Sequence, residues 1–132
     1  MHLIVCVEDN GGLSFCGRRL SFDRVVTAEI LRIASENKLW MNRYSSGLFT
    51  DQNVMVDEYF LQRAGKGEYC FLENIPVPDS LENIESIIVF RWNRRYPATV
   101  KFPIELLADR ELVETVEFTG FSHKTITMER YQ

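Results

Sequence analysis

The chain has few of the residues that build metal sites and disulfide frameworks. Its 132 residues include three cysteines, Cys6, Cys16 and Cys70, and two histidines, His2 and His123. The cysteines lack CxxC spacing and are odd in number, which argues against a disulfide framework and favours a reducing, cytoplasmic setting. The histidines stand alone in the sequence, without the clustered ligands that a zinc site needs. We therefore expect no metal site.

Long apolar runs and an excess of basic charge are also missing. The longest apolar stretches, such as residues 87–90, have the length of a core strand, so no membrane span is expected. No basic segment precedes residues 3–7, so a secretory signal is not expected either. The formal net charge of −4 gives no general attraction to nucleic acid or to anionic membranes. Arg91, Arg94 and Arg95 are a local exception, which fits either solvated charge or an anion contact.

What remains is an alternation of strand-like and helix-like segments without repeats or linkers. Short β-branched and aromatic runs predict strands. The expected strands are residues 3–7, 39–41, 54–56, 68–73, 86–92, 99–102, 111–118 and 124–131. The last two are separated by a short polar turn and predict a terminal antiparallel hairpin. The pattern indicates one α/β domain over residues 1–132, a mixed β-sheet sandwich with flanking helices.

The expected helices differ in length and in the quality of their boundary signals. Ser21 or Asp23 opens the longest, which ends near residues 37–38. Its apolar residues recur at three-to-four spacing and predict one buried stripe. They are Phe22, Val25, Val26, Ile30 and Ile33. Residues 43–49 predict one or two helical turns broken by Gly47, and Asp57 is expected to cap a helix over residues 58–64.

Several of these segments together resemble dihydrofolate reductases. Residues 4–11 (Ile-Val-Cys-Val-Glu-Asp-Asn-Gly) resemble the first strand of that family and its polar turn. Asp23 falls where the family has the acid that contacts the pterin, and residues 39–45 resemble the strand and turn that bind cofactor phosphates. There Arg43 matches the arginine of the family, with Ser45 beside it. The resemblance, which extends to the tyrosine-proline turn and the final hairpin, covers about three quarters of the chain.

The departures from the family concern the cofactor site. The interior of the chain is shorter than the family needs for that site. The glycine before Arg43 is replaced by Asn42, and the leucine-proline-tryptophan element before the acid is replaced by residues 19–21. Residues 69–74 lack the glycine pair that lets the backbone approach a pyrophosphate closely. The resemblance leaves NADPH open as a cofactor, but we expect none because its glycine-rich site is missing.

Each candidate site residue has two interpretations. Asp23 is either a catalytic or ligand-anchoring acid or a first-turn aspartate that stabilises the helix N-terminus by about 0.3–1 kcal/mol. Arg43 and Ser45 are either cofactor-binding residues or the solvent-facing start of a helix. Ser122 and His123 at the hairpin tip do not predict a nucleophile site, because neighbours on a turn cannot easily form an oriented nucleophile–base hydrogen bond.

Three functions follow, in descending order of support. The first is a divergent reductase-like domain without dihydrofolate reductase activity, acting as a non-enzymatic interaction or ligand-binding module, with a protein or a second copy of the chain as partner. The second is a small enzyme or binder for a nucleotide or pterin-like ligand, with Asp23 as the acid. The third is a ribonuclease, since similar short bacterial proteins are sometimes labelled ribonuclease Z. It would have to be metal-free, with His2 and His123 as acid and base. Nucleic acid is otherwise not an expected partner.

Overall fold

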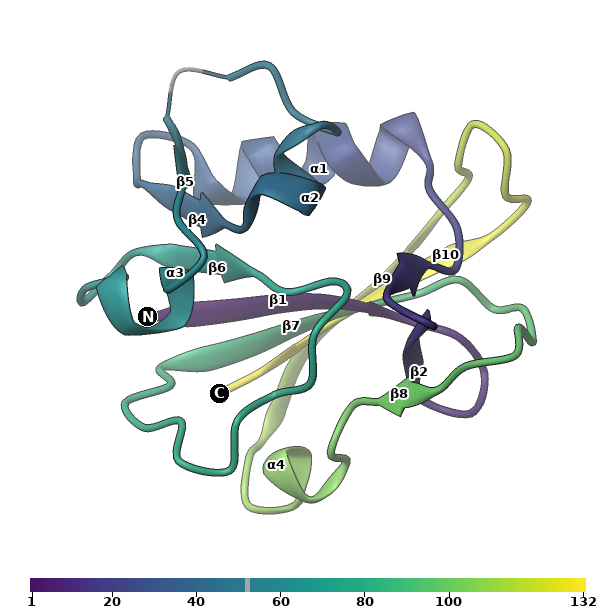
Figure 1. Cartoon of the computed structure of the whole chain (residues 1–132). Coiled ribbons are helices and arrows are strands. Elements are labelled where there is room, and N and C mark those ends of the chain that lie inside the picture. Colours follow the sequence, from purple (N-terminus) through teal and green to yellow (C-terminus); the bar gives the residue numbers. More distant parts are fainter. Residues whose placement is uncertain (52) are drawn as a thin grey trace.

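A mixed sheet forms the centre of the molecule (Figure 1). The structure, a computed structural model, describes residues 1–51 and 53–132. Within these residues the main sheet has the strand order β5-β4-β6-β1-β7-β10-β9. The strands are β1 (His2–Val7), β4 (Leu39–Met41), β5 (Val54–Val56), β6 (Tyr69–Phe71), β7 (Ser86–Arg91), β9 (Leu112–Phe118) and β10 (Ile126–Tyr131). The first five are mutually parallel, and β10 is antiparallel to both β7 and β9. The predicted α/β class, mixed sheet and terminal hairpin are confirmed.

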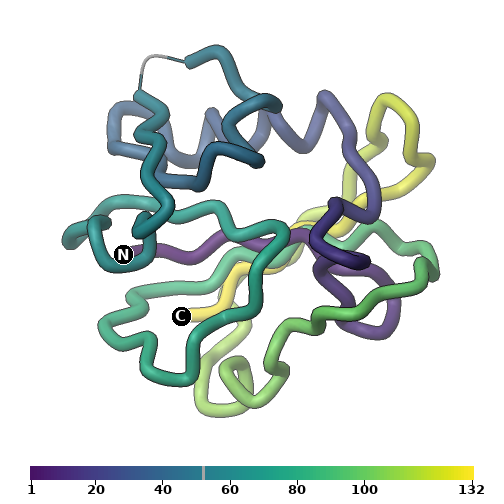
Figure 2. The backbone as a smooth tube through the Cα atoms, in the orientation of Figure 1, coloured from purple at the N-terminus to yellow at the C-terminus, as the bar shows by residue number. Residues whose placement is uncertain are grey.

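The two faces of the sheet are covered in different ways (Figure 2). On one face, Ile4 of β1 and Ile88 of β7 pack with the helix α1 (Arg24–Ala34). On the other face, Leu3 and Ile87 pack beneath the short helix α3 (Phe60–Arg63), the segment 75–84 and the helix α4 (Glu105–Ala108). Successive strand residues point to opposite faces, which explains why β1 and β7 read as continuous apolar runs.

The helix α1 is anchored by a stripe that differs slightly from the predicted one. Val26, Ile30 and Ala34 are buried at four-residue spacing. Phe22, which was assigned to the stripe, lies before the helix and is 55% exposed. The reason is the position of the N-cap, because Asp23 has extended backbone angles and the chain before it leaves the helix axis. The prediction for Phe22 is therefore wrong, whereas the predicted cap is confirmed.

A second, smaller sheet was not predicted. It has the order β3-β2-β8 and consists of β2 (Gly12–Phe15), β3 (Arg18–Arg19) and β8 (Val100–Lys101). The turn between β2 and β3 contains Cys16 and Gly17, both with positive φ. Gly12 is needed at the start of β2, because a Cβ there would overlap the Ala98 side chain. In the sequence these glycines indicate a loop, and in the structure they permit a tight hairpin.

The remaining helices are short. Residues 43–46 form α2 (Arg43–Ser46), which has Asn42 as its N-cap and Gly47 as its C-cap, in agreement with the predicted break. The predicted helix over residues 58–64 is wrong in its bounds, since α3 begins at Phe60. Asp57 does accept a hydrogen bond, from the Tyr59 N–H at 2.7 Å. This bond caps a turn before α3, while Tyr59 at the N-cap makes no side-chain cap bond.

The strand β9 forms the outer edge of the main sheet beside β10. Its alternating pattern predicted a half-buried strand, but every residue before Phe118 is exposed. Glu114 and Glu117 add charge to this edge, a composition that discourages further strand pairing. The prediction of half burial was wrong because an edge strand that no element covers is exposed on both faces.

Candidate functional site

In sheets of parallel strands, ligands usually bind beyond the carboxyl ends of the strands. At this edge the chain places Asn42 after β4, Glu73 after β6, Glu8 after β1 and Trp92 after β7. The N-terminus of α1 and the hairpin loop 119–125 approach the same edge (Figure 1). Glu8, Asp23 and Glu73 are all buried there. We call this region the carboxyl edge.

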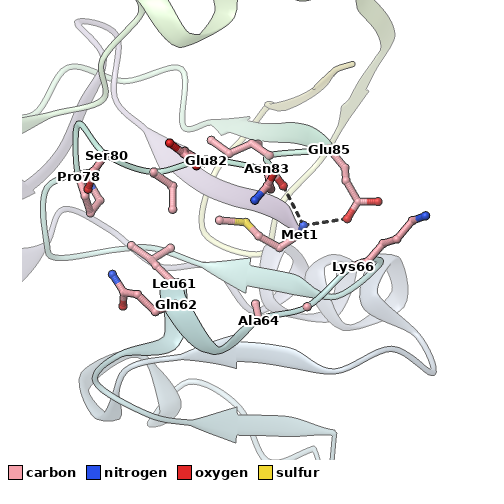
Figure 3. A pocket seen from close by; sticks show the side chains of 13 residues that line it. Met1, Leu61, Gln62, Ala64, Lys66, Pro78, Ser80, Glu82, Asn83 and Glu85 are labelled. Carbon is pink, nitrogen blue, oxygen red and sulfur yellow. Dashed lines mark hydrogen bonds and ion pairs between the residues drawn. The ribbon is translucent and has the colours of Figure 1, made fainter.

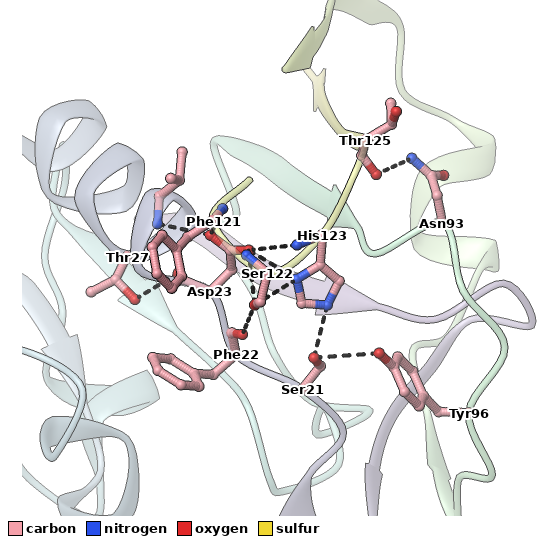
Figure 4. Close-up of polar contacts among 11 residues, drawn as sticks. Ser21, Phe22, Asp23, Thr27, Asn93, Tyr96, Phe121, Ser122, His123 and Thr125 are labelled. Carbon is pink, nitrogen blue, oxygen red and sulfur yellow. Dashed lines mark hydrogen bonds and ion pairs between the residues drawn. The ribbon is translucent and has the colours of Figure 1, made fainter. Parts of the chain in front are cut away.

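Asp23 joins the start of α1 to the hairpin loop. One carboxylate oxygen, Oδ1, accepts hydrogen bonds from the N–H groups of Val25 and Phe121, each at 2.9 Å. The other, Oδ2, accepts from the Ser122 N–H at 2.8 Å, the Ser122 hydroxyl at 3.2 Å and the His123 N–H at 3.2 Å. The His123 ring adds a further contact, from Nδ1 to Oδ2 at 2.9 Å (Figure 4).

These bonds leave Asp23 little capacity for a ligand. An ionised carboxylate offers about four lone-pair positions, and protein donors already surround both oxygens. Burial raises the pKa of Asp23, but hydrogen bonds from the Phe121 N–H, the His123 ring, Ser122 and the Val25 N–H outweigh it. Together they hold the pKa of Asp23 well below its usual range. Asp23 is therefore ionised at neutral pH, and both of its carboxylate oxygens accept hydrogen bonds from the protein.

The hairpin loop reaches Asp23 because of Gly120. A Cβ built on Gly120 would lie 2.5 Å from Asp23 Oδ2 and 2.7 Å from the Ile126 Cδ1 atom. Neither distance is tolerated by real side chains, so only glycine permits this approach. The Gly120 N–H also donates to the His123 carbonyl at 2.9 Å, which closes the turn.

His123 is held between Asp23 and Ser21. Its ring is buried and stacks on Trp92, with ring centroids 4.7 Å apart. Because the Asp23 carboxylate faces Nδ1, we assign the ring proton to Nδ1, which makes Nε2 an acceptor. Ser21 lies at Nε2, with its Oγ 2.8 Å away, and the Tyr96 hydroxyl donates to the same Oγ at 3.4 Å. Figure 4 shows this chain of contacts from Asp23 to Tyr96.

The cavity beside these residues is almost filled. Its volume is about 10 Å³, which is room for one water molecule at most. The walls come from Ser21, α1, Phe71, Glu73 and Trp92. The α1 side chains that line it beyond Asp23 are Val26, Thr27 and Ile30. A ring system the size of a pterin has no space here.

A second polar cluster lies beyond the carboxyl ends of β4 and β6. Glu73 forms a two-bond ion pair with Arg19, at 2.7 Å to Nε and 3.1 Å to Nη2. Ser45 is fully buried and donates its hydroxyl to Glu73 at 2.8 Å. The Arg19 guanidinium also lies over the Tyr44 ring, 4.5 Å from its centroid. This cluster lies where Arg43 and Ser45 were expected to hold a cofactor.

The sequence-predicted site residues thus fall into two separate groups. Asp23 belongs to the hairpin contacts, and Ser45 belongs to the Glu73 cluster. Arg43 is exposed, and its backbone N–H donates to Glu58 at 2.8 Å. No recorded hydrogen bond joins Asp23 to Arg43 or Ser45 in the described part of the chain.

Sequence reasoning missed Ser21, Arg19 and Glu73, and it undervalued His123. The only signal for Ser21 was its position before a helix cap. The only signal for Glu73 was an acid directly after an apolar strand. Both act through partners distant in the sequence, which a single sequence does not reveal.

The two histidines lie at opposite ends of the sheet. His2, at the start of β1, contacts the Ser86 hydroxyl at 2.6 Å, whereas His123 packs on Trp92, just after the end of β7. A strand rises about 3.3 Å per residue, so the six residues of β7 separate the two rings widely. This arrangement gives no support to a ribonuclease with His2 and His123 as an acid–base pair.

A larger hollow lies at the opposite, amino edge of the sheet. It has a volume of about 760 Å³ and is lined by α3, the turn 64–66 and the segment 78–85 (Figure 3). Leu61, Leu81 and Ile84 give it apolar walls, and Lys66 and Glu82 lie at its exposed side. The Met1 ammonium pairs with Glu85 at 2.8 Å in this region.

The described residues hold neither a cluster of metal ligands nor a helix that could span a membrane. Residues 1–51 and 53–132 contain no group of three or more His, Cys, Asp or Glu side chains placed to hold a metal ion. Over the same residues no helix is long and apolar enough to cross a bilayer.

Comparison with known proteins identifies the fold. No family model matches the sequence, and no curated protein matches it. Among solved structures, the chain is similar to dihydrofolate reductase from Enterococcus faecalis, determined in complex with NADP(H) and RAB-propyl. The TM-score is 0.71 at 15% identity, over 99% of this chain and 94% of that chain. The predicted dihydrofolate-reductase-like fold is confirmed, and at this identity the similarity extends to the fold alone.

Proposed function

We propose that the chain is a ligand-binding or interaction module on the dihydrofolate reductase fold that does not reduce dihydrofolate. The observation that carries this proposal is the cavity of about 10 Å³ beside Asp23. A reductase must seat a pterin ring next to its acid, and here side chains take up that space. Open α/β sheets bind ligands at this edge, so a closed carboxyl edge argues against the usual chemistry.

The polar groups support the same conclusion. Asp23 makes its contacts with the α1 cap and the hairpin loop, and it has no oxygen free for an aminopyrimidine edge. The Arg19–Glu73–Ser45 cluster takes up the region proposed for the cofactor phosphates. Arg19, which could otherwise bind a phosphate, is already paired with Glu73. We therefore propose that NADPH is not a cofactor, although the similar Enterococcus enzyme was solved with NADP(H).

In the alternative function, Asp23 is the acid that acts on a small nucleotide or pterin-like ligand. This function requires the carboxyl edge to open. The hairpin loop would have to release the Asp23 carboxylate, and several hydrogen bonds to a charged group would be lost at about 1.5–3 kcal/mol each. We keep a small nucleotide, a protein or a second copy of the chain as candidate partners, and a cytoplasmic location. The proposal covers the binding of NADPH and folate and the reduction of dihydrofolate, and it leaves other chemistry open, because Ser21 and His123 form an arrangement with chemistry of its own.

Thermal unfolding and a reductase assay test the proposal together. The melting temperature is measured with NADPH, NADP⁺, folate and dihydrofolate, using the Enterococcus enzyme as a positive control. A ligand of the native state at about a hundred times its Kd would stabilise that state by about 2.7 kcal/mol. We expect no shift with any of the four compounds and no dihydrofolate-dependent oxidation of NADPH.

Two results would contradict the proposal. One is a saturable rise in melting temperature with NADPH or folate. The other is turnover that the variant Phe22→Ala retains but Asp23→Asn loses, with both variants folded. Phe22 is a suitable control because it is the exposed neighbour of Asp23.

A further inference from the structure

We propose that Ser21 is an activated nucleophile for acyl transfer, with His123 as its general base and Asp23 as the residue that positions His123. This inference goes beyond the proposed function, because a module without folate chemistry can still carry a reactive serine. It rests on the geometry of three side chains from two segments: Ser21 and Asp23 lie just before α1, and His123 lies in the hairpin loop.

The three residues have the distances of a nucleophile–base–acid arrangement. Ser21 Oγ lies 2.8 Å from His123 Nε2, and His123 Nδ1 lies 2.9 Å from Asp23 Oδ2. Both values fall in the hydrogen-bond range of about 2.6–3.2 Å expected for such a site. Ser21 and His123 are 102 positions apart and Asp23 and His123 are 100 apart, so local chain geometry does not explain their meeting. The same arrangement of roles recurs on unrelated folds.

Asp23 is held more firmly than simple helix capping requires. The N–H groups of Phe121, Ser122 and His123 all donate to its carboxylate, which fixes the oxygen that faces His123. A buried carboxylate at Nδ1 keeps the proton there and stabilises the imidazolium that forms when Nε2 accepts a proton. Asp23 touches no substrate in this scheme and is a positioning residue.

The His123 ring has a single orientation open to it. Trp92 stacks on one face, with 26° between the ring planes. Nδ1 is fixed by Asp23, so Nε2 points to Ser21. The Tyr96 hydroxyl donates to Ser21 Oγ and leaves the serine proton directed at His123. Ser122 cannot take this role, because its hydroxyl lies on the Nδ1 side, 3.2 Å from Asp23 Oδ2.

Access to Ser21 sets the substrate class. Ser21 is half-buried and lies in the segment that precedes α1, next to the exposed Phe22. The cavity on its inner side has room for one water molecule only. An acyl group therefore has to approach from solvent, which favours small, activated esters such as aryl acetates.

The reaction balances without a cofactor. Ser21 Oγ bonds to the ester carbonyl carbon while the hydroxyl proton passes to His123 Nε2. The carbon–oxygen bond of the ester then breaks, and the leaving alcohol takes the proton from His123. Water attacks the acyl-serine, its proton passes through His123 to Ser21 Oγ, and a carboxylic acid is released. Ester and water give acid and alcohol, and nothing is oxidised or reduced.

A fluorophosphonate probe tests the proposal directly. Attack by Ser21 forms an oxygen–phosphorus bond and releases fluoride, and the modified peptide is identified by mass spectrometry. We expect the folded wild type to be labelled at Ser21 and to hydrolyse 4-nitrophenyl acetate. Ser21→Ala should lose both activities, whereas the control Ser80→Ala, at an exposed serine beside the hollow of the amino edge, should keep both. His123→Gln should slow labelling by roughly a hundredfold, the scale of general base catalysis.

The kinetic constants of two Asp23 variants separate a positioning role from a structural one. Because Asp23 touches no substrate, Asp23→Asn should lower kcat for 4-nitrophenyl acetate and leave KM unchanged. Asp23→Glu keeps a carboxylate and should recover part of the lost kcat. A purely structural role would give the two variants the same loss.

Circular dichroism and urea unfolding confirm that each variant is folded. Absence of label on Ser21 in the folded wild type would overturn the proposal, as would equal labelling of Ser21→Ala. These outcomes are independent of NADPH and folate binding, so failure here leaves the proposed function intact, and the reverse also holds.

Discussion

The carboxyl edge and the amino edge of the main sheet differ in how their charged groups are bonded and in the volume that they leave open. At the carboxyl edge three buried carboxylates, Glu8, Asp23 and Glu73, are bonded to protein donors, and the cavity there holds about 10 Å³. At the amino edge Lys66 and Glu82 lie at the surface beside a hollow of about 760 Å³. The edge that usually takes the ligand is the closed one. The comparison teaches that polar side chains at the carboxyl ends of parallel strands can be bonded within the protein and leave no room for a ligand.

Removing a core side chain at the carboxyl edge should give the largest loss in the free energy of unfolding. Phe71 is buried, lines the small cavity and packs against Phe49 with ring centroids 5.7 Å apart. Phe71→Ala should lower the free energy of unfolding by about 3–5 kcal/mol, since it removes a large core side chain and leaves a cavity. Urea unfolding followed by circular dichroism measures this. A loss below about 1 kcal/mol would mean that the edge is loosely packed.

The approach of the hairpin loop can be tested at Gly120. Gly120→Ala places a Cβ against Asp23 Oδ2 and Ile126, so the loop must move away and its hydrogen bonds to Asp23 weaken. We expect a loss of about 3 kcal/mol in the free energy of unfolding.

Gly47→Ala is the matched control. At Gly47 φ is −63°, and a Cβ would meet only the Tyr44 carbonyl oxygen, at 3.8 Å. Its effect should stay within about 0.5 kcal/mol. Equal effects of the two substitutions would contradict the role given to the loop.

The charge of Asp23 should make the closed edge sensitive to acid. Asp23→Asn should cost about 2–3 kcal/mol at neutral pH, because a charged acceptor of buried donors is lost. The pKa of Asp23 is lower in the folded than in the unfolded state. Its contribution is therefore complete above the unfolded pKa of about 3.9 and is lost as the pH falls through the folded pKa.

Urea unfolding at several pH values tests the direction of this pH dependence. The difference between wild type and Asp23→Asn should shrink as the pH falls below about 4. Asp57→Asn serves as control, since Asp57 also accepts a backbone N–H bond but is partly exposed. A difference that grows in acid would refute the assigned direction of the shift.

A substitution at the amino edge should lower the free energy of unfolding least. Leu81 lines the large hollow and is only partly buried. Leu81→Ala should lower the free energy of unfolding by less than about 1 kcal/mol, because the removed atoms already face solvent. The measurement is the same urea series used for Phe71→Ala. If the two substitutions cost the same, the contrast between the edges fails.

The fold could be predicted because its signals are local. The apolar runs of β1 and β7, the N-cap at Asp23 and the polar turn before β10 each follow from a few neighbouring residues. The small sheet was missed because β2 and β3 lie in a glycine-bearing segment that indicated a loop, although the strand at residues 99–102, which contains β8, was expected. Phe22 was misplaced because periodicity does not show where the chain leaves the helix axis.

The site could be predicted only in part because its contacts are not local. Asp23 was identified, but its partners lie about a hundred positions further along the chain. Ser45 was assigned to a cofactor, and its bond to Glu73 spans 28 positions. Pairing of this kind depends on the complete sheet, which brings the carboxyl ends of separate strands together. No periodicity in the sequence encodes it.

The distance in sequence between Asp23 and the hairpin loop also bears on how the chain folds. Closing a loop of this length costs entropy that is recovered only when both ends are in place. During synthesis α1 emerges long before Phe121, Ser122 and His123, so its N-terminus stays without these partners until residues 121–123 are made. The hairpin loop therefore completes the contacts of this helix, and a chain that stops short of residue 120 would leave a buried carboxylate without these donors.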